Sequence, residues 1–203
     1  MNYYYPIDDE IKVFKYINPT DSELTEYWKI TTKSKNGNIL TESYDSKFVL
    51  YNTFEEQVYP NNADLIRYTD TEKLANGGSI NIESDVMKKD VYKSDKLNPY
   101  NYAVSYKNNF GKFTFEKKRQ FVGFEEVQIS KTLYQSAKFK DEYFINAIDQ
   151  NDKYEFYQIT YYAKGIGMVK YERHIPSENV RILELEEIMS ESKFNIAKKK
   201  ASL

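Results

Sequence analysis

Residues 153–174 read KYEFYQITYYAKGIGMVKYERH, and this stretch decides the fold. Two aromatic-rich runs, 154–162 and 168–173, flank Gly165 and Gly167. Strands accept aromatic residues readily, because the rings pack well on a pleated surface. Glycine tolerates the backbone conformations that a kink or a bulge requires. We therefore predict two strands that meet at a structural corner formed by the two glycines.

The same residues, Gly165-Ile166-Gly167, have the spacing of part of a phosphate-binding loop. A loop of that kind opens a helix, so that the helix N–H groups face the anion. The residues that follow Gly167, Met-Val-Lys-Tyr-Glu, are typical of a strand instead. This context favours a structural role for the glycines over phosphate binding.

The rest of the chain has the same strand-forming character. Leu24, Trp28 and Ile30 share one face of residues 24–32, and alternation with period two marks a half-buried strand. The composition, with 20 Tyr and 12 Phe against 7 Gly and 5 Pro, also favours strands. No segment has the sustained apolar spacing of an amphipathic helix. The sequence therefore predicts an all-β protein with little helix.

Short turns separate consecutive strands, and this organisation predicts an antiparallel meander. A sheet of about ten twisted strands must curl, split or close. We predict a single strongly curved sheet, that is, a half-barrel or an open barrel. It forms one domain over residues 1–189, and a polar C-terminal tail, which we expect to be frayed, follows over residues 190–203.

Bulk composition excludes several classes of protein. The chain has no cysteine, which rules out disulfides, thiolate catalysis and cysteine-ligated zinc. Its 29 basic and 31 acidic residues give a net charge of -2, so we expect no nucleic-acid partner. No apolar run is long enough for a membrane-spanning helix. The first ten residues lack the pattern of a signal peptide.

Catalytic and metal-binding constellations are also missing from the sequence. His174 is the sole histidine, and no nucleophile motif accompanies it. The acidic doublets, such as Glu55-Glu56 and Glu186-Glu187, would point to opposite faces of a strand. We therefore expect no enzyme activity, no metal site and no cofactor.

The surplus of aromatic residues leaves one functional hypothesis. Most of these rings would form an ordinary core, but a half-barrel leaves part of its concave face open. An aromatic-lined concavity can bind apolar ligands. The candidate ligand-binding residues on that face are Trp28, Phe48, Tyr102, Tyr106, Phe113, Phe115, Phe156 and Tyr162.

Three segments resemble a pattern in uncharacterised bacterial cell-envelope proteins: residues 126–129, 133–143 and 161–170, the last reading YYAKGIGMVK. The opening Tyr4-Tyr5-Pro6-Ile7 is similar to the mature N-terminus of that family. The resemblance covers residues 3–189. Many family members are lipoproteins, and their fold is similar to the half-barrel of the lipoprotein carriers LolA and LolB. This chain lacks the cysteine that accepts a lipid.

The resemblance and the aromatic surplus together imply a non-enzymatic binding protein of the cell envelope. We expect it to hold a lipid, an acyl chain or an apolar segment of a partner in the concave face. The alternative is a protein–protein scaffold that uses a sheet edge or the outer face. We expect a monomer. It is periplasmic or associated with the outer membrane if a signal segment was removed, and cytoplasmic if Met1 is the native start.

Overall fold

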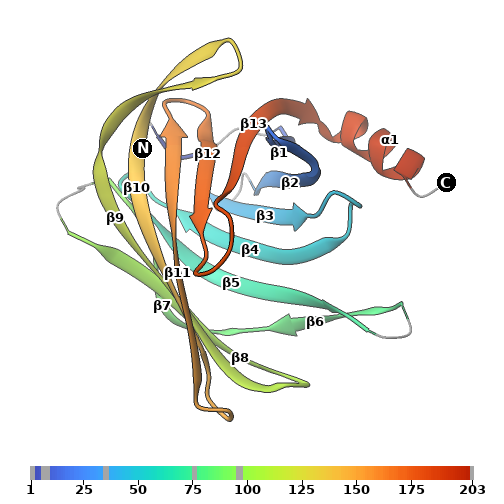
Figure 1. The fold of residues 1–203 in the computed structure, drawn as a ribbon, viewed down its shortest axis with the longest axis vertical. Helices are drawn as coiled ribbons and strands as arrows, with labels where there is room; N and C mark the ends of the chain where they lie inside the picture. The colour runs from blue at the N-terminus through green and yellow to red at the C-terminus, as the bar shows by residue number, and fades with distance from the viewer. Residues whose placement is uncertain (1–2, 6–9, 34–36, 75–76, 95–97, 202–203) are drawn as a thin grey trace.

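The computed structural model describes residues 3–5, 10–33, 37–74, 77–94 and 98–201. Within these residues it contains thirteen strands and one helix (Figure 1). In chain order they are β1 (Lys12–Asn18), β2 (Asp21–Lys33), β3 (Asn38–Tyr44), β4 (Leu50–Val58), β5 (Asn62–Lys73), β6 (Ser79–Glu83), β7 (Asp85–Lys93), β8 (Tyr100–Asn108), β9 (Gly111–Ile129), β10 (Thr132–Ala147), β11 (Asp152–Ala163), β12 (Gly167–His174), β13 (Arg181–Ser190) and α1 (Glu191–Ala201).

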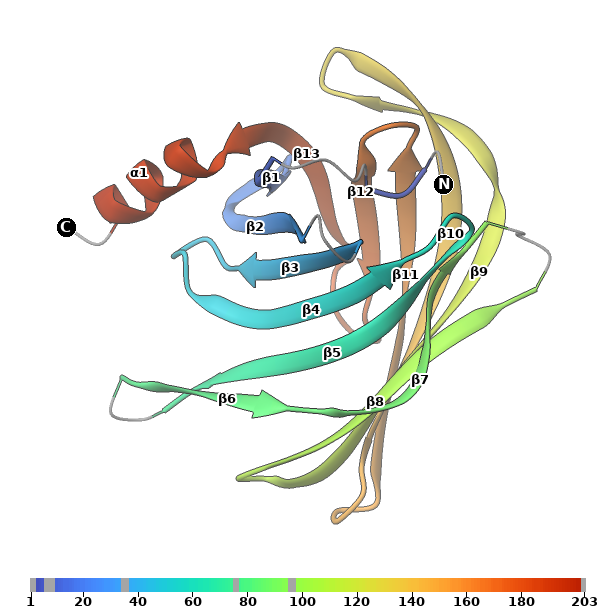
Figure 2. The same cartoon turned by 180° about the vertical axis from the view of Figure 1, so that it is seen from behind.

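Twelve of these strands, all except β6, close into one antiparallel barrel (Figures 1 and 2). Each ring strand pairs with its neighbours along the chain, so the order is that of a meander. The first strand also pairs with the last, from Lys12 opposite Ser190 to Ile17 opposite Glu184. The prediction of an open half-barrel of about ten strands is therefore wrong, although the all-β character is confirmed. The β1–β13 pairing is the reason, because it joins the two ends of the meander.

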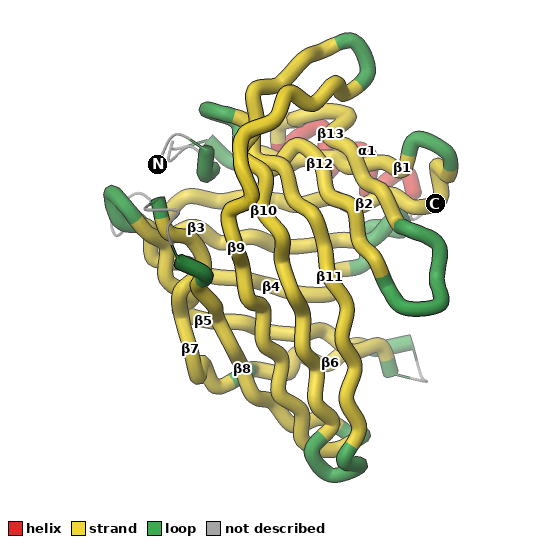
Figure 3. Tube along the Cα trace, turned by 60° about the vertical axis from the view of Figure 1, so that its left-hand side comes forward, coloured by secondary structure: helices red, strands yellow, loops and turns green. Residues whose placement is uncertain are grey.

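Strand β6 lies beside the ring rather than in it. The start of β5 pairs with β7, where Asn62 lies opposite Lys93, and its end pairs with β6, where Lys73 lies opposite Ser79. The β5–β6 hairpin consequently projects from the barrel wall (Figures 1 and 2). On another side of the barrel, β9, β10 and β11 are long strands that span its height (Figure 3).

The core occupies the barrel interior together with the segment Tyr3 to Tyr5. Tyr4 and Tyr5 are buried, and their rings contact Tyr162 at centroid distances of 6.2 Å in each case. The buried Tyr16 donates a hydrogen bond from its hydroxyl to the carbonyl of Met168 at 2.9 Å. Tyr4 and Tyr5 are thus part of the core. Pro6 and Ile7, which contribute to the family resemblance, lie outside the described residues.

The glycine corner is a hairpin turn between β11 and β12. Both predicted strands form, and the turn occupies residues 164–166. Gly165 and Gly167 have φ values of 74° and 106°, which L-residues with a side chain rarely adopt. At Gly167 the Tyr5 ring also comes so close that a Cβ atom would lie 2.3 Å from its Cδ1. A Cβ at Gly165 would meet nothing within 4 Å.

Substitutions at the two glycines can therefore distinguish backbone strain, which both positions share, from steric overlap with Tyr5, which occurs only at Gly167. Valine strains the backbone at either glycine by about 1–3 kcal/mol, and at Gly167 it must also displace the buried Tyr5 ring. We expect Gly167→Val to lower the free energy of unfolding by about 2 kcal/mol more than Gly165→Val, as measured by urea denaturation. Equal losses would contradict the role of the Tyr5 contact. An unfolding curve of Gly167→Val that superimposes on the parent would contradict the corner itself.

Residues Glu191–Ala201, part of the segment that we expected to be a frayed tail, form helix α1. The Ser190 hydroxyl accepts a hydrogen bond from the backbone N–H of Lys193, as an N-cap residue does. Glu191 in the first turn and Lys198, Lys199 and Lys200 in the last turn suit the helix dipole. Phe194 is 1% exposed and anchors the helix. Residues 191–201 are therefore ordered, because a single apolar anchor docks a helix with favourable ends.

Helix α1 packs on the outside of the barrel near β1 and β2 (Figures 1 and 2). Phe194 contacts the rings of Tyr44, Phe48 and Tyr27, with centroids 5.2, 5.6 and 5.7 Å away. We expect Phe194→Ala to cost about 3–5 kcal/mol of unfolding free energy, since it empties a fully buried site. Ile196→Ala is the matched control, because Ile196 is 58% exposed. Similar denaturation midpoints for the two variants would disprove the anchoring role.

Candidate functional site

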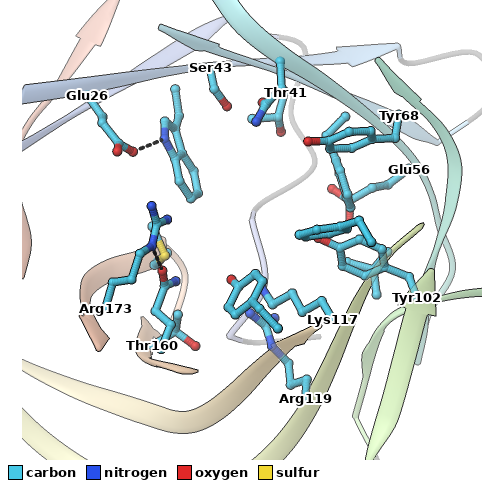
Figure 4. Close-up of a pocket in the computed structure, with 18 of the residues that line it drawn as sticks. Glu26, Thr41, Ser43, Glu56, Tyr68, Tyr102, Lys117, Arg119, Thr160 and Arg173 are labelled. Atoms are coloured by element: carbon cyan, nitrogen blue, oxygen red, sulfur yellow. Dashed lines mark hydrogen bonds between the residues drawn. The ribbon is translucent and has the colours of Figure 1, made fainter. Parts of the chain in front are cut away.

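A cavity of about 480 Å³ lies inside the barrel (Figure 4). Every ring strand except β1 contributes side chains to its wall, and so does the N-terminal segment, through Tyr4 and Tyr5. The side chains come together because the inward positions of adjacent strands repeat every second residue. The wall combines aromatic rings with charged groups. This mixture distinguishes the cavity from the apolar groove that the sequence suggested.

Five of the eight predicted ligand-binding residues line this cavity: Trp28, Tyr102, Phe115, Phe156 and Tyr162. The other three lie elsewhere. Phe48 packs under α1 outside the barrel, and its φ of 58° places it in a turn before β4. Tyr106 and Phe113 stack on each other beside the β8–β9 turn, with centroids 5.5 Å apart.

A cluster of buried charges surrounds Asp141. The Asp141 carboxylate accepts two hydrogen bonds from Arg119, at 2.6 Å from Nε and 2.8 Å from Nη2. Lys117 Nζ lies 3.1 Å from the same carboxylate, and Thr160 donates to it at 3.2 Å. Burial alone would raise the pKa of Asp141, but Arg119 and Lys117 hold it below its ordinary value. Asp141 is therefore ionised, and its hydrogen-bonding capacity is largely used.

The two cations of this cluster face the cavity. Burial and the neighbouring Arg119 lower the pKa of Lys117. The Arg119 guanidinium lies over the ring of Tyr162, 5.0 Å from its centroid, and donates to the Tyr162 hydroxyl at 3.3 Å. One carboxylate thus serves two cations, so the cluster carries a net positive charge.

A second buried carboxyl, Glu56, faces the cavity from β4 (Figure 4). Tyr4 donates a hydrogen bond to its Oε1, which connects the N-terminal segment to the barrel wall. Burial raises the pKa of Glu56 to about 7, although the Tyr4 hydrogen bond, Arg119 and Lys117 oppose this shift. Glu56 therefore changes charge near neutral pH.

This shift predicts a pH dependence of stability. Glu56 keeps a proton in the folded protein between pH 4.5 and about 7, where an unfolded glutamate loses it. Its stabilising contribution is therefore complete below pH 4.5 and is lost as the pH rises through this window. A pKa shift of this size corresponds to on the order of 3 kcal/mol.

Urea denaturation at pH 5 and pH 8 tests this prediction. We expect Glu56→Gln to lose less unfolding free energy than the parent between these two pH values. Glu155→Gln is the matched control, because Glu155 is exposed on β11 and does not line the cavity, so this variant should show the same pH dependence as the parent. The same pH dependence in the parent and in Glu56→Gln would contradict the shift.

The other carboxylate that lines the cavity, Glu26, accepts hydrogen bonds from three donors. Tyr171 donates to Oε1 at 2.8 Å, and Trp28 Nε1 and Tyr51 each donate to Oε2 at 3.1 Å. The bond from Trp28 orients the indole, which lines the cavity. Arg173 from β12 and Arg181 from β13 also line the cavity.

Sequence reasoning missed the charged half of the site. One signal was present: Phe113, Phe115, Lys117 and Arg119 follow one another at every second position of β9, so they share one face. The predicted ligand-binding face included Phe113 and Phe115 of this strand but did not continue to Lys117 and Arg119. Strand periodicity alone would have extended that face to the two cations.

Other candidate features lie away from the cavity or are not found. His174 stacks on Tyr157 with centroids 4.3 Å apart, beside a shallow surface pocket. Among the described residues, no group of three or more His, Asp or Glu side chains could hold a metal ion. The described helix is also too short and too polar to cross a membrane.

These observations define a closed up-and-down barrel with a charged, aromatic internal cavity. No family model and no curated protein matches the sequence. A solved structure described as "a putative lipoprotein" from Parabacteroides distasonis matches with a TM-score of 0.55 at 11% identity, over 93% of this chain and 99% of that chain. It shows a shared fold.

A second solved structure, "a putative exported protein with YmcC-like fold" from Bacteroides fragilis, has a TM-score of 0.48 at 16% identity. The match covers 94% of this chain and 100% of that chain. Both similar structures are thus described as lipoprotein or exported proteins. The predicted similarity to LolA and LolB is not shown by these matches.

Proposed function

We propose that this protein is a non-enzymatic binding protein of the bacterial cell envelope. It holds a lipid, an acyl chain or an apolar segment of a partner inside its barrel. The observation that carries the proposal is the cavity of about 480 Å³, whose size falls within the range of small-molecule sites. The predicted concave face becomes the barrel interior.

The aromatic wall supports an apolar ligand. Tyr102 packs against Phe54 and Phe115, with centroids 5.2 and 5.9 Å apart, and Tyr143 stacks on Phe156 at 4.5 Å. These contacts hold the rings in place, so their apolar surfaces are already arranged before a ligand enters. A preformed apolar wall reduces the entropy that binding costs.

The location and the absence of catalysis are part of the same proposal. The description of the Parabacteroides structure as "a putative lipoprotein" supports a place in the envelope, either periplasmic or associated with the outer membrane. His174, the sole histidine, lies beside Tyr157 and does not line the cavity. This position supports a binding role rather than acid–base chemistry.

The alternative function, a scaffold that adds a partner strand to its sheet edge, has less support. Barrel closure gives each ring strand a neighbour on both sides. Strand β6 pairs with β5 alone and has five residues, which is a short edge for strand addition. The cavity therefore favours a protein that holds an apolar ligand inside its barrel, which we call the carrier function, over the scaffold.

Two measurements test the carrier function, that is, the binding of an apolar ligand inside the barrel. We expect native mass spectrometry of the gently purified protein to show a lipid-sized adduct that denaturation releases. We also expect the neutral dye Nile red to bind and to quench the fluorescence of Trp28, because Trp28 is the single tryptophan and lines the cavity.

A pair of matched variants locates the site. Thr41 lines the cavity, whereas Thr53 on the adjacent β4 does not. Thr41→Phe should fill part of the cavity and weaken Nile red binding by roughly tenfold, while Thr53→Phe should leave it unchanged. Equal binding by both variants would place the dye elsewhere, and no quenching in the parent would overturn the proposal.

A further inference from the structure

Two arginines face the cavity from neighbouring strands. Arg173 on β12 lies directly opposite Arg181 on β13 in the antiparallel register. Residues at opposite positions of adjacent strands point to the same side of the sheet, and both side chains line the cavity. Figure 4 shows Arg173 pointing into the open centre, across from Tyr102.

Neither guanidinium is neutralised by an ion pair within the part of the chain that the structure describes. Arg173 donates from Nε to the buried Gln158 at 3.0 Å, and its cation lies 5.1 Å from the centroid of the Tyr171 ring. These contacts orient Arg173 and use a single N–H group. The remaining donors of both side chains are available to a ligand, and arginine stays charged at any ordinary pH.

The carboxylates that line the cavity or contact its wall already have hydrogen-bond partners. Asp141 is bound by Arg119 and Lys117, and Glu26 accepts three hydrogen bonds. Glu56 is bonded by Tyr4 and is partly protonated near neutral pH. The cavity thus holds an excess of positive charge, although the whole chain has a net charge of -2. Glu26 attracts the Arg173 cation electrostatically, but no carboxylate among the described residues forms a direct ion pair with Arg173 or Arg181.

We propose that Arg173 and Arg181 form an anion-binding end of the cavity, and that the ligand is an amphiphile with an anionic head. This inference rests on the proposed function and specifies its ligand. The carboxylate or phosphate head pairs with the two guanidinium groups, which match such oxygens in a bidentate manner. The tail lies along the aromatic wall that begins at Phe156, 5.8 Å from the Arg173 cation.

The same arrangement should lower the stability of the ligand-free protein. Two like charges directly opposite each other on adjacent strands destabilise a sheet. A bound anion removes that repulsion. The pair is therefore expected to lower the stability of the empty barrel and to raise the affinity for a negatively charged ligand.

Displacement of Nile red by decanoate and by 1-decanol tests the proposal, because the two probes differ only in their head groups. In the parent, we expect decanoate to act at a concentration roughly tenfold or more below that of 1-decanol. In the double variant Arg173→Gln/Arg181→Gln, this preference should fall below about twofold. The displacement by 1-decanol should not change.

Arg67→Gln is the matched control, because Arg67 pairs with Glu55 and does not line the cavity. It should keep the full preference for decanoate. The double variant should melt at or above the melting temperature of the ligand-free parent. A large drop in melting temperature would assign the two arginines a structural role and overturn the proposal.

The remaining outcomes separate this proposal from the carrier function. Equal displacement by decanoate and 1-decanol in the parent would overturn the anionic end and leave the carrier intact. Failure of Nile red and of both probes to bind would overturn both. Inorganic phosphate should compete weakly with decanoate, because it has no tail. Competition at equal concentration would show that the arginines bind a free anion, and would overturn the amphiphile.

Discussion

The pairing of the first strand with the last is the interaction on which the rest of the structure depends. Through β1 and β13 the two ends of the meander become neighbours, and the curved sheet becomes a ring. In an open sheet, the inward side chains would be exposed to water along one whole side. In the closed ring they face one another, so that the space between them is an internal cavity with a low dielectric constant.

In that environment, each interior charge needs hydrogen-bond or ion-pair partners. An unpaired buried charge is costly, and the barrel reduces the cost in different ways at different positions. Asp141 and Glu26 are surrounded by donors, whereas Glu56 responds with a raised pKa. Arg173 has one hydrogen bond, to Gln158, and among the described residues neither Arg173 nor Arg181 has a direct ion pair with a carboxylate. The interior therefore has one region whose charges are paired within the protein and another, around Arg173 and Arg181, whose charges have no direct ion pair among the described residues.

The local sequence pattern predicted many of the residues that line the cavity, but it did not predict that the barrel closes. Period-two alternation placed Trp28, Phe115 and Tyr162 on inward faces, because that signal is written within each strand. No local sequence pattern indicates the pairing of Lys12 with Ser190. Pairing between distant strands depends on the geometry of all the strands between them. Phe48 was misplaced because a turn residue does not follow strand alternation, and α1 was missed because Phe194 is its one buried anchor.

The β1–β13 pairing also sets the order in which the chain can assemble. A strand that begins at Lys12 cannot complete its ladder until Ser190 is available, which requires nearly the whole polypeptide. Until then β1 presents an unpaired edge, and the inward aromatic residues have no opposite wall. Contacts of such long sequence separation form slowly. The barrel is thus closed last, and the nascent chain must remain free of wrong strand partners until its final strand arrives.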